Sequence, residues 1–156
     1  MGTLTATELN SVLNVVTSWL DGVDDVLAVA LVGSYARGAA RPDSDVDVMI
    51  LMRDPAELRR DTRWVHAIPW ARIGRRLVRW EDADYGAAWS RHVLLANDRG
   101  PARVDGRVLE VELCFAGPSW ARTSPVDDGT HYVMKKGCRV LRDRGGLMRG
   151  LLTALS

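Results

Sequence analysis

The feature that most constrains the fold is a pair of short apolar stretches joined by a turn-rich segment. Val26–Val32 is wholly apolar and ends at Gly33-Ser34, and Asp45–Met52 alternates acidic and apolar residues before it becomes wholly apolar. Stretches of this length that end in glycine or in charged residues are typical of strands. The pattern therefore predicts two strands, the first of them buried.

Helical and strand patterns alternate along the rest of the chain. Thr5–Leu20 repeats apolar residues at spacings of three and four, with Thr5 or Thr7 as the N-cap, and the small residues of Ser34–Ala40 suit a helix of two turns. Further helices are predicted at Pro55–His66 and Leu147–Leu155, and further strands at Arg76–Glu81, Trp89–Ala96, Arg107–Ala116 and, as a strand or a turn, Arg139–Leu141.

Turn signals at Asp98–Pro101 and Asp105-Gly106 separate the Trp89–Ala96 and Arg107–Ala116 strands, so consecutive strands here should be antiparallel. The order of elements predicts an α/β (α+β) fold, with a mixed β-sheet and helices mainly on one face. No linker or repeat divides the chain, and a single domain is expected over residues 1–156.

The amino-acid composition limits the classes of partner that the protein is expected to bind. With 21 basic and 20 acidic side chains the formal charge is +1, which argues against nucleic acid as a partner. The longest apolar stretch is far shorter than the roughly 20 residues of a membrane helix, so no membrane partner is expected. Cys114 and Cys138 are expected to be reduced, in a cytoplasmic protein.

Asp45 and Asp47 form a candidate cation site. Residues two apart on a strand point to the same face, so the two carboxylates should lie side by side while Val46 and Val48 point into the core. Two neighbouring negative charges are costly unless a cation lies between them. Carboxylate oxygens suit Mg²⁺, which also keeps phosphate oxygens and water as ligands.

Gly33-Ser34 is a candidate phosphate site. Glycine allows the backbone to approach a ligand closely, and the free N–H groups at the start of a helix attract anions. The Ser34 hydroxyl can donate to a phosphate oxygen, and Arg37 can contact phosphate or remain solvated. A phosphate site beside a metal-binding carboxylate pair is what phosphoryl or nucleotidyl transfer requires.

A third carboxylate is expected from the strand that ends at Ala116. Its apolar residues share one face, and Glu110 and Glu112 share the other. If this strand lies beside the Asp45 strand, one glutamate can reach the same metal or act as a base toward an acceptor hydroxyl. Glu112 is the preferred residue and Glu110 the alternative; both can also be the solvated face of a strand.

Gly33-Ser34 and Asp45-Val46-Asp47 together resemble the signature of the polymerase-beta-like nucleotidyltransferase superfamily. The longer string GSYARGAARPDSDVDVMIL is similar to aminoglycoside and lincosamide nucleotidyltransferases and to minimal, antitoxin-type nucleotidyltransferases. The resemblance implies that Gly33 and Ser34 hold the triphosphate, and that Asp45, Asp47 and Glu112 hold Mg²⁺, as two ions. It also implies transfer of a nucleoside monophosphate from an NTP, with ATP the expected one, to an acceptor hydroxyl with release of pyrophosphate.

Several alternatives stay open at this point. The acceptor can be a small molecule or a protein. No helical acceptor-binding domain is evident after Ala116, so the acceptor is expected to bind this domain's own face, a second subunit such as that of a homodimer, or a partner protein. An antitoxin-type enzyme that modifies or masks a partner protein and a non-catalytic nucleotide-binding module are the alternative functions.

Other conspicuous residues carry weaker expectations. The three histidines have no ligand-like spacing and no cysteine close by, which argues against a zinc site. Arg72, Arg75, Arg76 and Arg79 can steer an anion or form a solvated face. Most of the six tryptophans are expected in the core.

Overall fold

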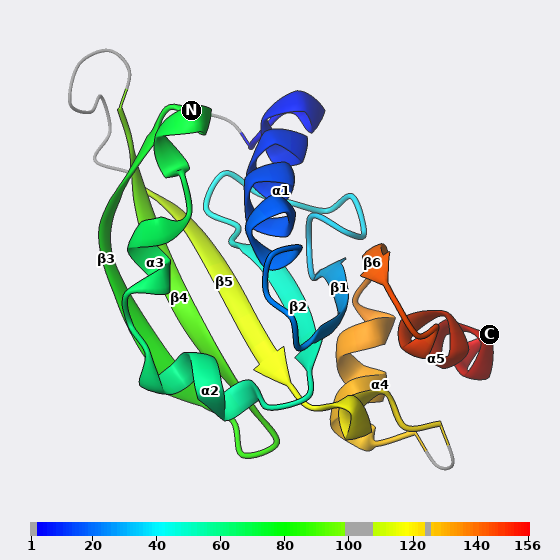
Figure 1. Ribbon diagram of the computed structural model, residues 1–156. Coiled ribbons are helices and arrows are strands. Elements are labelled where there is room, and N and C mark those ends of the chain that lie inside the picture. Colours follow the sequence, from blue (N-terminus) through cyan, green and yellow to red (C-terminus); the bar gives the residue numbers. More distant parts are fainter. Residues whose placement is uncertain (1–2, 99–107, 124–125) are drawn as a thin grey trace.

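The computed structural model describes residues 3–98, 108–123 and 126–156 (Figure 1). Within these residues six strands form one sheet in the order β3-β4-β5-β2-β1-β6. The strands are β1 (Val26–Val32), β2 (Val46–Met52), β3 (Arg75–Asp84), β4 (Ala88–Asn97), β5 (Leu109–Ala116) and β6 (Cys138–Asp143). All the predicted strands are present, and the undecided Arg139–Leu141 segment is a strand.

The sheet is mixed, as predicted. β2 and β5 are parallel, whereas β1 pairs with β2 and β6, and β4 pairs with β3 and β5, in antiparallel fashion. The antiparallel order of β3, β4 and β5 confirms the interpretation of their connections, although the turn signals at residues 99–101 and 105–106 lie outside the described residues. β5 lies directly beside β2, which was the condition for a third carboxylate to reach the Asp45 strand.

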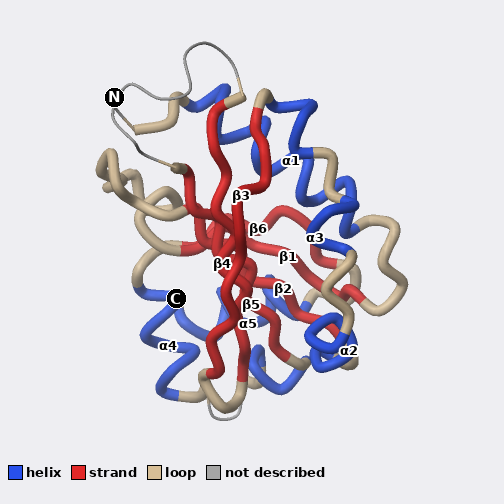
Figure 2. The backbone as a smooth tube through the Cα atoms, turned by 90° about the vertical axis from the view of Figure 1, so that its left-hand side faces the viewer, coloured by secondary structure: helices blue, strands red, loops and turns tan. Residues whose placement is uncertain are grey.

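Helices cover the two faces of the sheet unequally. Of the helices in the described residues, α1 (Ala6–Leu20), α2 (Pro55–Arg60) and α3 (Trp64–Ala67) pack on one face, over a core that runs from β1 to β4. α4 (Asp128–Lys135) and α5 (Leu147–Leu155) pack on the other face against β1, β2 and the end of β5. Figure 2 shows these two layers from the side. The second layer reaches only half of the sheet, and the matching face of β3, β4 and the start of β5 carries mainly polar residues.

The helices at the two ends of the chain agree with their patterns. Thr5 is the N-cap of α1: its side chain accepts from Glu8 N–H, and the Glu8 carboxylate accepts from Thr5 N–H. This reciprocal pair satisfies two N–H groups that a helix start leaves without a partner. α5 has the predicted bounds. α4 was not predicted, although Asp127 caps it by accepting from Gly129 and Thr130 N–H.

The predicted helix at Ser34–Ala40 is wrong, and the segment is a single tight turn. Gly38 has a left-handed φ of 72°, and Ala39 N–H donates to Ser34 O at 2.9 Å. A left-handed glycine with this bond ends a helix, because it satisfies the carbonyl that the next turn would need. The segment therefore closes after one turn.

The predicted helix at Pro55–His66 is interrupted and becomes α2 and α3. Asp61 is extended, with φ −103° and ψ 120°, and its carboxylate accepts from Arg63 N–H at 3.0 Å. Side chains also take the carbonyls that a continuous helix would use. Trp64 Nε1 donates to Leu58 O at 2.7 Å, and Arg91 donates to the carbonyls of Arg59 and Asp61. Side-chain bonds of this kind compete with the helix.

Two remaining expectations concern the cysteines and the membrane. Cys114 and Cys138 are free thiols. None of the helices in the described part of the chain has the length and apolar character needed to cross a membrane.

Candidate functional site

Acidic side chains meet where β2 and β5 run side by side. Asp45 immediately precedes β2, and Asp47 lies opposite Glu112 in the parallel register. Ligand oxygens of Asp45, Asp47 and Glu112 all lie within 4.8 Å of one another. The structure thus brings together the three residues that the sequence selected for the metal.

The cluster lies on the face of the sheet away from α1. Val46, Val48 and Ile50 of β2 are buried under α1, and the intervening Asp47 points to the opposite face. Asp45, Asp47 and Glu112 are half-buried there. The alternation of β2 therefore gives one apolar face and one polar end, as its sequence pattern predicts.

Burial and mutual repulsion make this cluster costly to ionise. Burial, together with the nearby Glu112 and Asp45 carboxylates, raises the pKa of Asp47 to about 7. Burial and the neighbouring Glu110 and Glu112 raise the pKa of Asp45 to about 7. Carboxyl groups that hold protons to near-neutral pH gain most from a cation that replaces those protons. A divalent cation therefore fits this donor set, with hard oxygen ligands of the kind Mg²⁺ uses.

Ser90 on β4 fixes the orientation of Glu112. The Ser90 side chain is fully buried, and its hydroxyl donates to Glu112 Oε2 at 2.8 Å. One Glu112 carboxylate oxygen is thereby bonded to β4, and this bond holds the carboxylate near Asp47.

His92 lies two residues along β4 from Ser90 and contacts the other glutamate. Its Nδ1 lies 2.9 Å from Glu110 Oε2, and its Nε2 lies 3.8 Å from Glu112 Oε2. Burial acts to lower the pKa of His92, but the bond to Glu110 and the charge of Glu112 raise it. Asp45, His92 and Glu110 form a second group whose ligand atoms lie within 4.8 Å of one another.

Gly33 follows β1, and two separate features of the structure require a glycine at this position. Its φ of 78° is left-handed, and a Cβ at this position would collide with the Asp47 carboxylate. Only a residue without a side chain lets the end of β1 approach Asp47 this closely. The predicted phosphate turn and the predicted metal ligand are thus in direct contact.

Ser34 and Arg37 occupy the turn after Gly33. The first backbone hydrogen bond of the turn comes from Ala36 N–H to Gly33 O, and in the described part of the chain no backbone acceptor pairs with the N–H groups of Ser34 and Tyr35. Arg37 Nη1 donates to Lys136 O at 2.9 Å, and Gly137 packs on the backbone of Arg37. Arg37 therefore fastens the turn to the α4–β6 connection.

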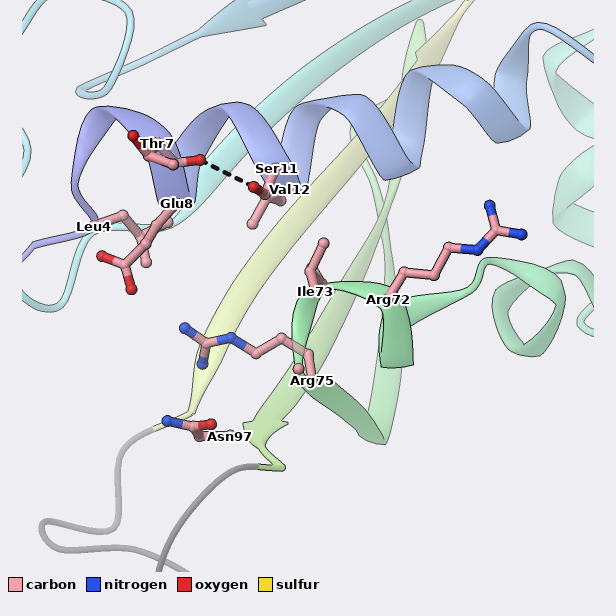
Figure 3. Close-up of a pocket in the computed structure, with 10 residues that line it drawn as sticks. Leu4, Thr7, Glu8, Ser11, Val12, Arg72, Ile73, Arg75 and Asn97 are labelled. Carbon is pink, nitrogen blue, oxygen red and sulfur yellow. Dashed lines mark hydrogen bonds between the residues drawn. The ribbon is translucent and has the colours of Figure 1, made fainter.

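A cavity in the described part of the structure lies away from these carboxylates. It has a volume of about 320 Å³ and lies between α1 and the 3₁₀ turn Trp70–Ile73 that precedes β3 (Figure 3). Arg72 and Arg75 of the basic run line it, together with Glu8 and Asn97. This cavity is on the α1 face, whereas the carboxylates open onto the opposite face. The candidate functional site is therefore identified by its cluster of carboxylates, and not by the presence of a cavity.

Sequence reasoning missed Ser90 and His92. Neither belongs to a recognisable motif, and both reach the cluster only because β4 pairs with β5 so that Ser90 faces Cys114 and His92 faces Glu112. The signal available was alternation: Ser90 and His92 share one face of a strand as Glu110 and Glu112 do. The pairing register that joins them is not visible in the sequence.

Comparison with known families supports the resemblance. Residues 14–79 match the family described as a nucleotidyltransferase domain. The matched segment extends from α1 into β3 and contains Gly33, Ser34, Asp45 and Asp47, whereas Glu112 lies beyond it. No curated protein matches the chain at a significant level.

Proposed function

We propose that the protein transfers a nucleoside monophosphate from a Mg²⁺-bound NTP to an acceptor hydroxyl, because residues 14–79 match the nucleotidyltransferase domain family. The observation that carries this proposal is the convergence of Asp45, Asp47 and Glu112 beside the Gly33 turn. The acceptor oxygen bonds to the α-phosphorus, the bond from that phosphorus to the bridging oxygen breaks, and pyrophosphate leaves.

Each residue of the site has a role in this proposal. The N–H groups of Ser34 and Tyr35 and the Ser34 hydroxyl bind the outgoing phosphates, as backbone turns do at other phosphate sites. Asp45, Asp47 and Glu112 would hold the Mg²⁺ ions. When bound, Mg²⁺ neutralises phosphate charge as it develops during transfer. Ser90 keeps Glu112 in place, and Arg37 keeps the turn in place through Lys136.

The acceptor is proposed to bind the polar face of β3, β4 and β5. This face is next to the carboxylates and is not covered by α4 or α5. Tyr85 is 58% exposed there, close to His92. The glutamate that lies nearer the acceptor can take its proton.

The identity of the nucleotide, the location and the assembly are extensions of this proposal. ATP is the proposed nucleotide, and two Mg²⁺ ions are proposed per site. The free thiols of Cys114 and Cys138 support a cytoplasmic location. A homodimer is also proposed, in which the second subunit would wall off the otherwise open site, and light scattering of the purified protein measures whether it forms.

The test is label transfer from α-labelled NTPs with Mg²⁺ in the presence of candidate hydroxyl acceptors and cell extract. The wild type is compared with the Asp45→Asn/Asp47→Asn variant and with Asp43→Asn. Asp43 is an exposed carboxylate of the same segment, outside the cluster, so its variant controls for loss of charge.

Label on a small molecule or a protein with the wild type and with Asp43→Asn, but not with the double variant, would establish nucleotidyl transfer. The labelled product would also identify the acceptor class. Equal transfer by the double variant would contradict the proposal. Mg²⁺-dependent NTP binding without transfer would indicate the non-catalytic alternative.

A further inference from the structure

We propose that Asp45, His92 and Glu110 form a second cation site that prefers a transition-metal ion such as Zn²⁺ to Mg²⁺. This site goes beyond nucleotidyl transfer, which the Asp45–Asp47–Glu112 group can serve alone. The sequence argued against zinc because no histidine has a ligand-like spacing. The fold brings together possible ligands from three separate segments, which spacing along the sequence does not reveal.

The geometry meets the first requirement of a metal site. One imidazole nitrogen and two carboxylate oxygens lie within 4.8 Å of one another, so a single ion can contact all three. Asp45 precedes β2, His92 lies on β4 and Glu110 lies on β5, and the pairing of these strands fixes their positions. Leu94 faces Glu110 directly across the strands and His92 faces Glu112, so His92 reaches Glu110 diagonally.

The surroundings of His92 supply the outer contacts that a metal-binding imidazole uses. Nδ1 faces Glu110, whereas Nε2 lies 3.8 Å from Glu112 Oε2 and 3.5 Å from the Tyr85 hydroxyl. A metal-binding histidine usually donates its other ring N–H to a carboxylate or similar acceptor. Here Nδ1 is positioned to bind the ion, and Nε2–H is positioned to donate to the Tyr85 hydroxyl.

The Asp45–His92–Glu110 and Asp45–Asp47–Glu112 groups differ in their ligand atoms, and we therefore expect them to prefer different metal ions. The Asp45–Asp47–Glu112 group offers oxygen only, which suits Mg²⁺. The second site adds an imidazole, which suits Zn²⁺ and related ions, and Zn²⁺ also accepts carboxylate oxygens as ligands. Asp45 belongs to both groups.

The test is calorimetric titration of the full chain, without nucleotide, with Zn²⁺ and separately with Mg²⁺. His92→Gln, which keeps a polar side chain of similar reach, and Glu110→Gln are each expected to weaken Zn²⁺ binding by at least about tenfold. His66→Gln is the matched control, because His66 is an exposed histidine of α3. Cys114→Ser controls for binding by the thiol on the same face. Thermal melting checks that each variant is folded.

The outcomes are distinct. The proposal is supported if Zn²⁺ binds more tightly than Mg²⁺, and if His92→Gln and Glu110→Gln lose Zn²⁺ binding while His66→Gln and Cys114→Ser keep it. It is overturned if His92→Gln binds Zn²⁺ as the wild type does, or if only Cys114→Ser loses the ion. Asp47→Asn separates the two sites: it should lose Mg²⁺-dependent NTP binding and retain Zn²⁺. Failure of the nucleotide proposal would therefore leave this result intact.

Discussion

The Asp47 carboxylate occupies the space into which a Cβ on Gly33 would project. The end of β1 and a proposed metal ligand of β2 are therefore fitted to each other, and the left-handed φ of 78° at Gly33 is part of that fit. This contact lets the roles of backbone strain and of steric displacement be separated by experiment.

Gly33→Ala is expected to abolish Mg²⁺-dependent NTP binding, because the added methyl group displaces Asp47. Gly38→Ala is the matched control. Gly38 has a similar φ of 72°, but nothing lies within 4 Å of its Cβ position. Both variants should lose about 1–2 kcal/mol of unfolding free energy from the left-handed backbone. Only Gly33→Ala should lose binding; equal loss in both would mean that strain, and not the Asp47 contact, is responsible.

Asp47→Asn is expected to stabilise the metal-free protein above pH 7. The pKa of Asp47 in the fold, about 7, lies above its usual 3.8, so the folded protein binds this proton more tightly than the unfolded chain does. Stability is consequently lost as the pH rises from 3.8 toward about 7. At pH 8 the variant should melt roughly 2–4 °C higher than the wild type, the shift that 1 kcal/mol gives in a domain of this size. The difference should be smaller at pH 5, and at about pH 3, below the pKa of the unfolded chain, the two should melt alike. A lower melting temperature for the variant at pH 8 would contradict this account.

Binding of Mg²⁺ is expected to weaken below pH 7, because the ion must displace protons from Asp45 and Asp47, whose pKa values are both about 7. The loss should approach roughly tenfold per pH unit for each proton displaced. Calorimetric titration with Mg²⁺ and NTP at pH 6 and pH 8 measures it. A constant affinity over this range would show that these carboxylates are not the ligands.

How far the sequence predicts the fold depends on whether neighbouring residues decide the structure. α1 and β1 follow from apolar periodicity and from the Thr5 cap, which are local. The Pro55–His66 pattern is helical by the same rules, but Arg91 and Trp64 take its carbonyls through contacts that the local sequence does not encode. The helix predicted at Ser34–Ala40 is absent because Gly38 ends the turn before a helix is established.

The residues of the candidate site also differ in whether the local sequence is enough to predict their positions. Asp45 and Asp47 are two residues apart, so a strand places them together without any further information. Glu112 needed the additional condition that β5 lie beside β2, which the alternation of β5 suggested but could not decide. Ser90 and His92 depend on the register between β4 and β5, to which the sequence gives no access.

Arg91 is expected to be the costliest single charge to remove from the described core. Its side chain is fully buried and stacks over the rings of Trp64, Trp80 and Trp89 at 4.8, 4.4 and 5.1 Å. Two of its nitrogens bind the two Asp82 oxygens at 2.7 and 2.8 Å. Arg91→Met keeps much of the apolar contact but leaves Asp82 and the α2–α3 carbonyls without this partner. The expected loss in urea unfolding is about 3 kcal/mol.

Arg142→Met is the matched control for Arg91→Met. Arg142 binds Asp21 with two bonds of 3.0 and 3.1 Å, so the pair has nearly the same geometry. The two side chains are 45% and 46% exposed, however, and water can replace the lost bonds. The expected loss is therefore below about 1 kcal/mol. Similar losses in the two variants would show that burial of Arg91 between the tryptophans adds nothing. A large loss for Arg91→Met alone would show that the buried guanidinium stabilises the fold more than the exposed one does.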